Sequence, residues 1–129
     1  MAKRFEYARD RRYALISRLF LFRPRRDAVV LTDDGRLRAT YGPFSIDTPL
    51  ENVSGAHVTR EYRWWTPFGV RLSGRDSGIT FGTTARAGTC IHFSEPVRSP
   101  LNRRHGHEAL TVTVADPDGL VAALGFAPE

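Results

Sequence analysis

The fold of this chain is decided by residues 27–48, which read DAVVLTDDGRLRATYGPFSIDT. The stretch begins with apolar and β-branched side chains. The Asp34-Gly35 pair that follows favours a hairpin turn, because both positions tolerate positive φ. Residues 36–41 then alternate between polar and apolar side chains, as a strand with one buried face does. After a Gly-Pro break, residues 44–48 form another short alternating run. The stretch therefore predicts three short strands joined by tight turns.

The β pattern continues beyond this stretch. Residues 49–52 read as a single turn. Further short strands are expected at 53–60, 70–73, 79–82, 90–94 and 110–114. Many short strands with glycine-rich turns between them argue for an antiparallel sandwich or a small barrel.

Two segments depart from this pattern. Asp116 can cap a helix and Pro117 suits its first turn, so a helix over about 116–124 is expected to pack on the sheet. Residues 95–108 contain two prolines, three arginines and two histidines, and they predict a long loop.

The charge is uneven along the 129 residues, whose net charge is +5. Residues 1–26 carry nine of the nineteen basic side chains and two acids, a net charge of +7, so the remainder is nearly neutral. Apolar side chains in this segment recur at helical spacing and predict a helix over about 9–21, with a strand as the alternative. A cationic helix with an apolar face is typical of segments that lie on an anionic membrane. The alternative is an apolar stripe that packs on the body of the protein.

Composition bounds the class of protein. A chain of 129 residues with 41% hydrophobic side chains suits one domain with a real core. The single cysteine fits a reducing compartment, and neither a secretory signal nor an apolar run of membrane-spanning length is visible. We therefore expect a cytoplasmic protein that is at most peripherally held at the inner membrane face.

Two stretches carry a family resemblance. Residues 27–59 read DAVVLTDDGRLRATYGPFSIDTPLENVSGAHVT and resemble small bacterial proteins with a pleckstrin-homology-like (PH-like) barrel. Residues 64–93 read WWTPFGVRLSGRDSGITFGTTARAGTCIHF and are similar to an uncharacterised actinobacterial family. The resemblance spans most of residues 27–125. It implies a mainly β fold, an antiparallel PH-like barrel of about seven or eight strands with a C-terminal helix. Segment 1–26 would be an N-terminal helical extension that such a barrel does not need.

The resemblance also bears on binding. Domains of this kind bind acidic lipid headgroups, peptides or other proteins, and the family has no established activity to carry over. In lipid-binding members, basic residues around the first hairpin often hold phosphates, which implies that role for Arg36 and Arg38. An ordinary solvated strand face is the alternative. The candidate anion- or lipid-binding residues are Arg11, Arg12, Arg18, Arg25, Arg26, Arg36 and Arg38.

Trp64 and Trp65 form an aromatic patch beside a Thr-Pro turn. On a strand one of them faces inward and the other outward, and the outward one is a candidate contact for a protein partner. It can alternatively stack on a nucleic-acid base while the arginines hold phosphates. The remaining interpretation is that both tryptophans cover the barrel.

Cys90 and His92 share one face of their predicted strand, with Ile91 and Phe93 on the other. A thiolate–imidazole pair is a candidate nucleophile. Residues two apart on a strand are separated by roughly 6–7 Å at the backbone, which disfavours direct pairing. A structural role is therefore expected for both residues.

His105, His107 and Glu108 are candidates to ligate a metal together with His92. A true site needs three or four converging ligands with outer-shell support, which a flexible loop does not supply. We therefore expect no catalytic residues, no metal and no cofactor.

These observations predict one mainly β domain over residues 27–129 behind a basic segment, 1–26. Its expected function is non-catalytic binding of a protein partner or of anionic lipid. The alternatives are a nucleic-acid-contacting protein that uses the N-terminal arginines and an enzyme that uses Cys90 and His92. An exposed β edge or an outward tryptophan offers a route to a homodimer.

Overall fold

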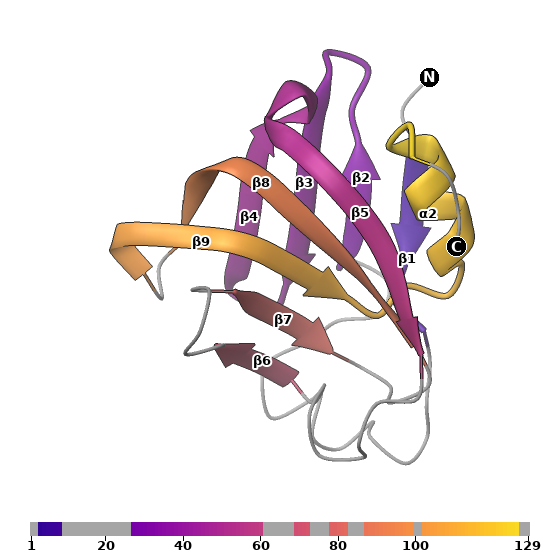
Figure 1. The fold of residues 1–129 in the computed structure, drawn as a ribbon. Helices are drawn as coiled ribbons and strands as arrows, with labels where there is room; N and C mark the ends of the chain where they lie inside the picture. The colour runs from indigo at the N-terminus through magenta and orange to yellow at the C-terminus, as the bar shows by residue number, and fades with distance from the viewer. Residues whose placement is uncertain are drawn as a thin grey trace.

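The strands fall into two sheets in the computed structural model, which describes residues 3–8, 27–60, 69–72, 78–82, 87–99 and 102–126. The first sheet has the strand order β1-β2-β3-β4 and the second has the order β5-β8-β9-β7-β6. Figure 1 shows β5, β8 and β9 crossing in front of the first sheet, with helix α2 to one side. The expectation of a mainly β fold with one C-terminal helix is thus confirmed.

The first sheet is built from the stretch that begins at Asp27. β2 (Ala28–Leu31), β3 (Arg36–Tyr41) and β4 (Phe44–Pro49) pair antiparallel, and their bounds confirm the three predicted strands. Gly35 has φ +82° in the hairpin turn, a conformation that glycine adopts without strain. The apolar side chains of β3 are buried and its polar ones face outward, as the alternation predicts.

β1 (Lys3–Glu6) is a strand that the sequence did not predict, within a segment expected to be largely helical. It pairs antiparallel with β2, and the next residue, Tyr7, forms an isolated bridge with Val114. The N-terminus therefore joins the first sheet to the segment that leads into α2. The helix predicted over about 9–21 lies outside the described residues.

The second sheet departs from the expected antiparallel barrel. It contains β5 (Val53–Arg60), β6 (Gly69–Leu72), β7 (Ile79–Gly82), β8 (Ala87–Ser99) and β9 (Asn102–Val112). β9 returns from β8 and enters between β8 and β7, so it pairs with β7 in parallel. The two sheets formed by the described residues do not close into a barrel. Among those residues, the edge strands of one sheet, β1 and β4, are not hydrogen-bonded to the edge strands of the other, β5 and β6.

The prediction of a long loop over 95–108 is wrong, because β8 and β9 run through it as one long hairpin. Pro96 lies within an irregularity of the β8–β9 pairing, where a proline need not remove a ladder hydrogen bond. Gly106 has φ +77°, and a Cβ at this position would lie 3.0 Å from the Cβ of Pro96. A proline on one strand and a glycine on the other therefore fit together and let both strands continue.

The core lies between the two sheets and is one cluster of apolar side chains. Its fully buried members come from both sheets and from α2 (Pro117–Ala123). The Asp116 side chain accepts a hydrogen bond of 3.0 Å from the Gly119 backbone N–H, which confirms the predicted cap. Leu120 and Val121 are buried, and α2 packs against β5 and β8. In the described part of the chain, no helix has the length and apolar character needed to cross a membrane.

Candidate functional site

Arg36 and Arg38, two of the predicted anion-binding residues, are both joined to one carboxylate. Arg36 Nε lies 2.8 Å from Asp47 Oδ1, and Arg38 Nη2 lies 3.2 Å from Asp47 Oδ2. The β3–β4 register places Arg38 directly opposite Asp47 on the outer face of the first sheet. All three side chains are more than a third exposed, so these ion pairs contribute only about 0–1 kcal/mol each.

A second carboxylate lies near the same arginines. The Thr32 hydroxyl donates a hydrogen bond to Asp34, and this bond is the main cause that lowers the pKa of Asp34. The positive charges of Arg36 and Arg38 lower the pKa of Asp34 further. Two carboxylates therefore accompany the two guanidinium groups, and an incoming phosphate would have to compete with them. Binding of a phosphate by Arg36 and Arg38 stays a prediction.

The other predicted binding residues lie outside the part of the chain that the structure describes. These residues are Arg11, Arg12, Arg18, Arg25, Arg26, Trp64 and Trp65.

An open groove of about 720 Å³ lies where the end of the first sheet meets β8. One wall comes from the end of β4 and from the 3-10 helix η2 (Leu50–Asn52), which confirms the turn predicted at 49–52. The other wall is residues 94–98 of β8. We call this feature the inter-sheet groove. Its lining residues are Asp47, Thr48, Pro49, Glu51, Asn52, Ser94, Glu95, Pro96, Val97 and Arg98.

The Asn52 side chain ties the two walls of the inter-sheet groove together. Asn52 Oδ1 accepts a hydrogen bond of 2.9 Å from the Glu95 backbone N–H. Asn52 Nδ2 donates at 3.0 Å both to the Glu95 backbone oxygen and to Thr48 Oγ1. One amide therefore pairs with the β8 backbone as a neighbouring strand would, and it sets the distance between the walls.

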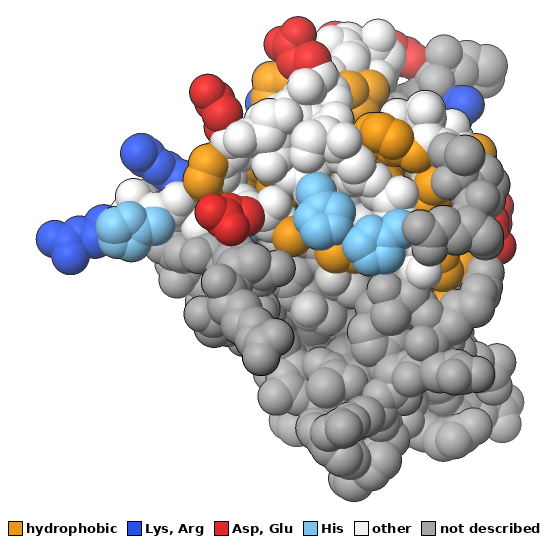
Figure 2. Space-filling view, in the orientation of Figure 1, with side chains coloured by type: hydrophobic (Ala, Val, Ile, Leu, Met, Phe, Trp, Pro, Cys, Tyr) orange, Lys and Arg blue, Asp and Glu red, His pale blue; other side chains and the backbone are white. Residues whose placement is uncertain are grey.

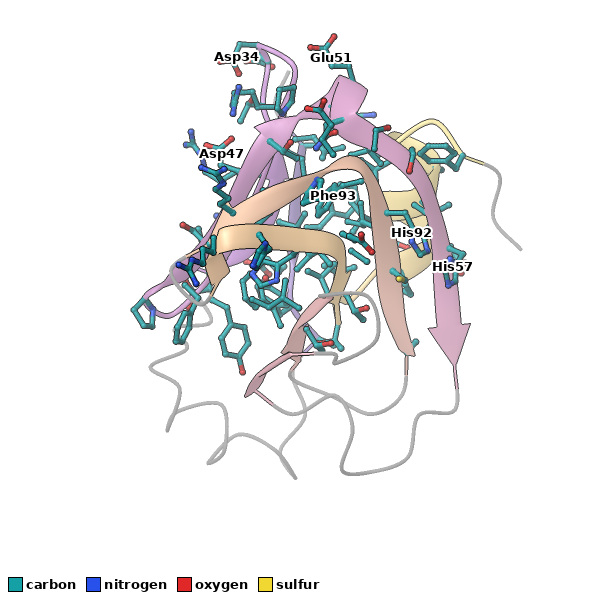
Figure 3. All side chains as sticks on the ribbon, turned by 60° about the vertical axis from the view of Figure 1, so that its left-hand side comes forward. Asp34, Asp47, Glu51, His57, His92 and Phe93 are labelled. Atoms are coloured by element: carbon teal, nitrogen blue, oxygen red, sulfur yellow. The ribbon has the colours of Figure 1, made fainter. Side chains whose placement is uncertain are left out.

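The acidic side chains that line the inter-sheet groove differ in whether they form ion pairs. Asp47 is neutralised by two arginines from β3, whereas Glu51 and Glu95 are exposed and form no ion pair within the described residues. Arg98 supplies a positive charge on the β8 wall. Figure 3 shows Glu51 and Asp47 projecting on the β4–η2 side of the molecule, away from His57 and His92. The groove therefore offers two carboxylates to a ligand and one guanidinium beside them.

A second group of side chains converges on the outer face of the second sheet. The β5–β8 register places His57 opposite Cys90, and His92 is the next outward residue on β8. Cys90 Sγ lies 3.6 Å from His92 Nε2, and the His57 and His92 rings stack with their centroids 5.2 Å apart. Figure 2 shows two histidine side chains adjacent at the centre of this face, and Figure 3 labels them. All three residues are half-buried.

This convergence corrects the expectation that Cys90 and His92 are too far apart to pair. The backbone separation along a strand is real, but both side chains project from the same face. The imidazole is long enough to reach back toward the thiol, and the 3.6 Å separation is the result. Ile91 and Phe93 are buried on the other face, as predicted.

The histidines of β9 are not part of this cluster. His107 is buried, and its Nε2 lies 2.6 Å from Ser99 Oγ in a hydrogen bond across the β8–β9 hairpin. His105 and Glu108 are exposed. Within the described residues, the group of metal-ligating side chains that includes His92 contains His57 and Cys90 and none of these three.

Five residues that these sites use were not predicted from the sequence: His57, Glu51, Asn52, Glu95 and Arg98. His57 lies on a strand whose bounds were predicted correctly, so a polar side chain on its outer face was a usable signal. The register that brings His57 opposite Cys90 carried no comparable signal, because it depends on which strands pair. Asn52 ended a predicted turn, and Glu95 began the segment mistaken for a loop.

No protein-family model, curated protein or solved structure matches this chain.

Proposed function

We propose that this chain is a non-catalytic binding module and that the inter-sheet groove holds an extended segment of a protein partner that carries basic side chains. The observation that carries the proposal is the Asn52 bridge, in which two hydrogen bonds of 2.9 and 3.0 Å to the Glu95 backbone join the two walls and a third, of 3.0 Å, anchors Asn52 to Thr48. A groove whose walls are already tied together loses little conformational freedom when a ligand enters it.

The charges of the groove favour a basic ligand over a phosphate. Glu51 and Glu95 are exposed carboxylates, and each would attract a lysine or arginine and repel a phosphate. Arg98 also lines the groove, and its guanidinium group can donate hydrogen bonds to a single acidic side chain or to a backbone carbonyl. This pattern suits a peptide better than the headgroup of an anionic lipid.

The chemistry of the lining supports binding rather than catalysis. Among the described residues that line the groove are carboxylates, hydroxyls, an amide and a guanidinium, but no thiol or imidazole. Cys90 and His92 lie on the outer face of the second sheet, and neither lines this groove. The relation to PH-like proteins belongs to the same proposal. It is supported by the mainly β fold and the C-terminal helix, and the lone cysteine fits a cytoplasmic location.

The proposal can be tested with peptides selected from a random display library on the purified protein. We expect the selected peptides to be basic and extended. The double variant Glu51→Lys, Glu95→Lys should weaken their binding at least about tenfold, which corresponds to about 1.4 kcal/mol. Glu108→Lys makes a matched control, because Glu108 is an exposed carboxylate on β9 that does not line the groove. That variant should bind within about twofold of the wild type.

Two results would count against the proposal. One is unchanged binding by the double variant. The other is binding to vesicles that contain anionic lipid, provided that Arg36→Ala and Arg38→Ala abolish it. The second result would favour the membrane alternative and would place the binding surface on the first sheet.

A further inference from the structure

We propose that His57, Cys90 and His92 form a binding site for one divalent metal ion of the zinc class, with a thiolate and two imidazoles as its protein ligands. This site lies apart from the inter-sheet groove, so the proposal does not depend on what the groove binds. It rests on three ligand-bearing side chains from two neighbouring strands that converge on one face.

The separation between thiol and imidazole matches the geometry of zinc. With Zn–S of about 2.3 Å and Zn–N of about 2.0–2.1 Å, a sulfur and a nitrogen of one tetrahedral site lie about 3.6 Å apart. Cys90 Sγ and His92 Nε2 are 3.6 Å apart. The ligand atoms of all three residues lie within 4.8 Å of one another. Ligand atoms of one tetrahedral zinc site lie about 3.3–3.6 Å apart, so His57 would have to move closer to Cys90 and His92 when the ion binds.

The strands that carry these ligands form a rigid support. β5 and β8 stay in register from Gly55↔His92 to Arg60↔Ala87. Ile91 and Phe93 are anchored in the core, and alternation along β8 then directs Cys90 and His92 outward. A site whose ligands project from paired strands needs little reorganisation when the ion arrives.

The site has room for a fourth ligand. Gly55 lies opposite His92 on β5, and a Cβ added to Gly55 would meet no atom within 4 Å. The three ligands are half-buried, so one side of the site reaches the surface. Three protein ligands with one open position are typical of zinc sites that also bind water or another donor, whereas closed structural sites have four protein ligands.

The ligand types select the metal class. A thiolate and two imidazoles suit zinc and other borderline or soft ions, whereas magnesium and calcium prefer oxygen ligands. A cluster that serves packing alone would have the same stacked rings but would bind no metal tightly. Measurement of metal binding therefore separates the two roles.

The test uses the full chain, free of any tag, reduced and stripped of metal, and titrated with cobalt(II) as a spectroscopic probe. We expect one cobalt per chain, a thiolate-to-cobalt charge-transfer band in the near ultraviolet and strong visible bands of a tetrahedral ion, all displaced by zinc. Cys90→Ser should abolish the charge-transfer band. His57→Gln and His92→Gln should each weaken cobalt binding at least about tenfold.

His105→Gln is the matched control, because His105 is an exposed histidine outside the cluster, and it should bind cobalt as the wild type does. Far-ultraviolet circular dichroism of the metal-free variants reports whether each one is folded. The proposal is overturned if folded wild-type protein binds no cobalt. It is equally overturned if Cys90→Ser keeps the wild-type affinity, or if His105→Gln alone loses the bound ion.

Discussion

The outer faces of the two sheets make the most useful comparison in this molecule. On the first sheet, Arg36 and Arg38 surround Asp47, so two cations meet one anion and the charges largely satisfy one another. On the second sheet, His57, Cys90 and His92 bring three potential metal-ligand atoms within 4.8 Å of one another. Side chains that lie close together do not by that alone form a binding site. A cluster whose side chains can all bind the same ligand, as metal-ligating atoms can, is stronger evidence for a binding site.

The largest expected effect concerns zinc and thermal stability. If the outer face of the second sheet binds zinc, a free zinc concentration of about 100 times Kd should stabilise the protein by about 2.7 kcal/mol. With metal binding weakened at least about tenfold, this gain should fall to about 1.4 kcal/mol or less in His57→Gln. It should persist in Asp47→Ala, because Asp47 is not part of the second-sheet cluster. Differential scanning calorimetry with and without zinc measures both. Equal gains in the two variants would contradict the distinction between the faces.

Asn52 offers the next largest effect, at the seam where the two sheets meet beside β4. Asn52→Ala removes three hydrogen bonds and should lower the free energy of unfolding by about 1–2 kcal/mol, since its partners partly regain water. Asn52→Asp is an informative partner variant. It keeps the acceptor for the Glu95 N–H but sets a carboxylate oxygen against the Glu95 backbone oxygen, so it should be destabilised at least as much as Asn52→Ala. A stability equal to that of the wild type in both variants would show that the seam does not need this bridge.

Tyr7 lies at the opposite seam, where the chain leaves β1 and bridges Val114. Burial raises the pKa of Tyr7 well above its ordinary value, and the negative charge of Asp27 adds to the effect. In the unfolded chain the Tyr7 phenol ionises at about pH 10, whereas in the folded protein it stays protonated. Stability is therefore unaffected below that pH and should fall above it by roughly 1.4 kcal/mol per pH unit.

The check is urea unfolding of wild type and Tyr7→Phe at neutral pH and at about pH 11. The variant should lose less stability between the two conditions than the wild type does. Parallel losses in the two proteins would assign the alkaline effect to other groups.

The smallest effect on stability is expected from Asp47→Ala, because its ion pairs are exposed and contribute about 0–1 kcal/mol. Its informative consequence is in binding. Without the carboxylate, Arg36 and Arg38 become available, so binding to vesicles that contain anionic lipid should increase and should weaken with added salt. Unchanged vesicle binding would indicate that Asp47 does not mask these arginines.

Local patterns in the sequence were reliable where the structure depends on local chemistry. The Asp34-Gly35 turn, the alternation of β3 and the Asp116 cap each rest on residues close together in the chain, and each was predicted. The segment 95–108 failed for the opposite reason. Pro96 favours a loop by itself, and only its contact with Gly106 on the partner strand explains how it fits within a long hairpin.

In the candidate sites too, features that depend on one strand were predictable, whereas features that depend on contacts between strands were not. Cys90 and His92 could be assigned to one strand face from alternation, but His57 joins them only through the β5–β8 register. The inter-sheet groove was not foreseen at all, because Asn52 and Glu95 are 43 residues apart and meet by a side-chain bridge.

By itself, the sequence determined the class of fold, the bounds of most strands in the described part of the chain and the position of the C-terminal helix. These features follow from side-chain periodicity and from turn and cap residues that act over a few positions. Only the tertiary structure decided the strand order, the parallel β7–β9 pair and the meeting of His57 with Cys90. Each of these is a relation between distant segments, set by which arrangement buries the shared core, and no local pattern encodes it.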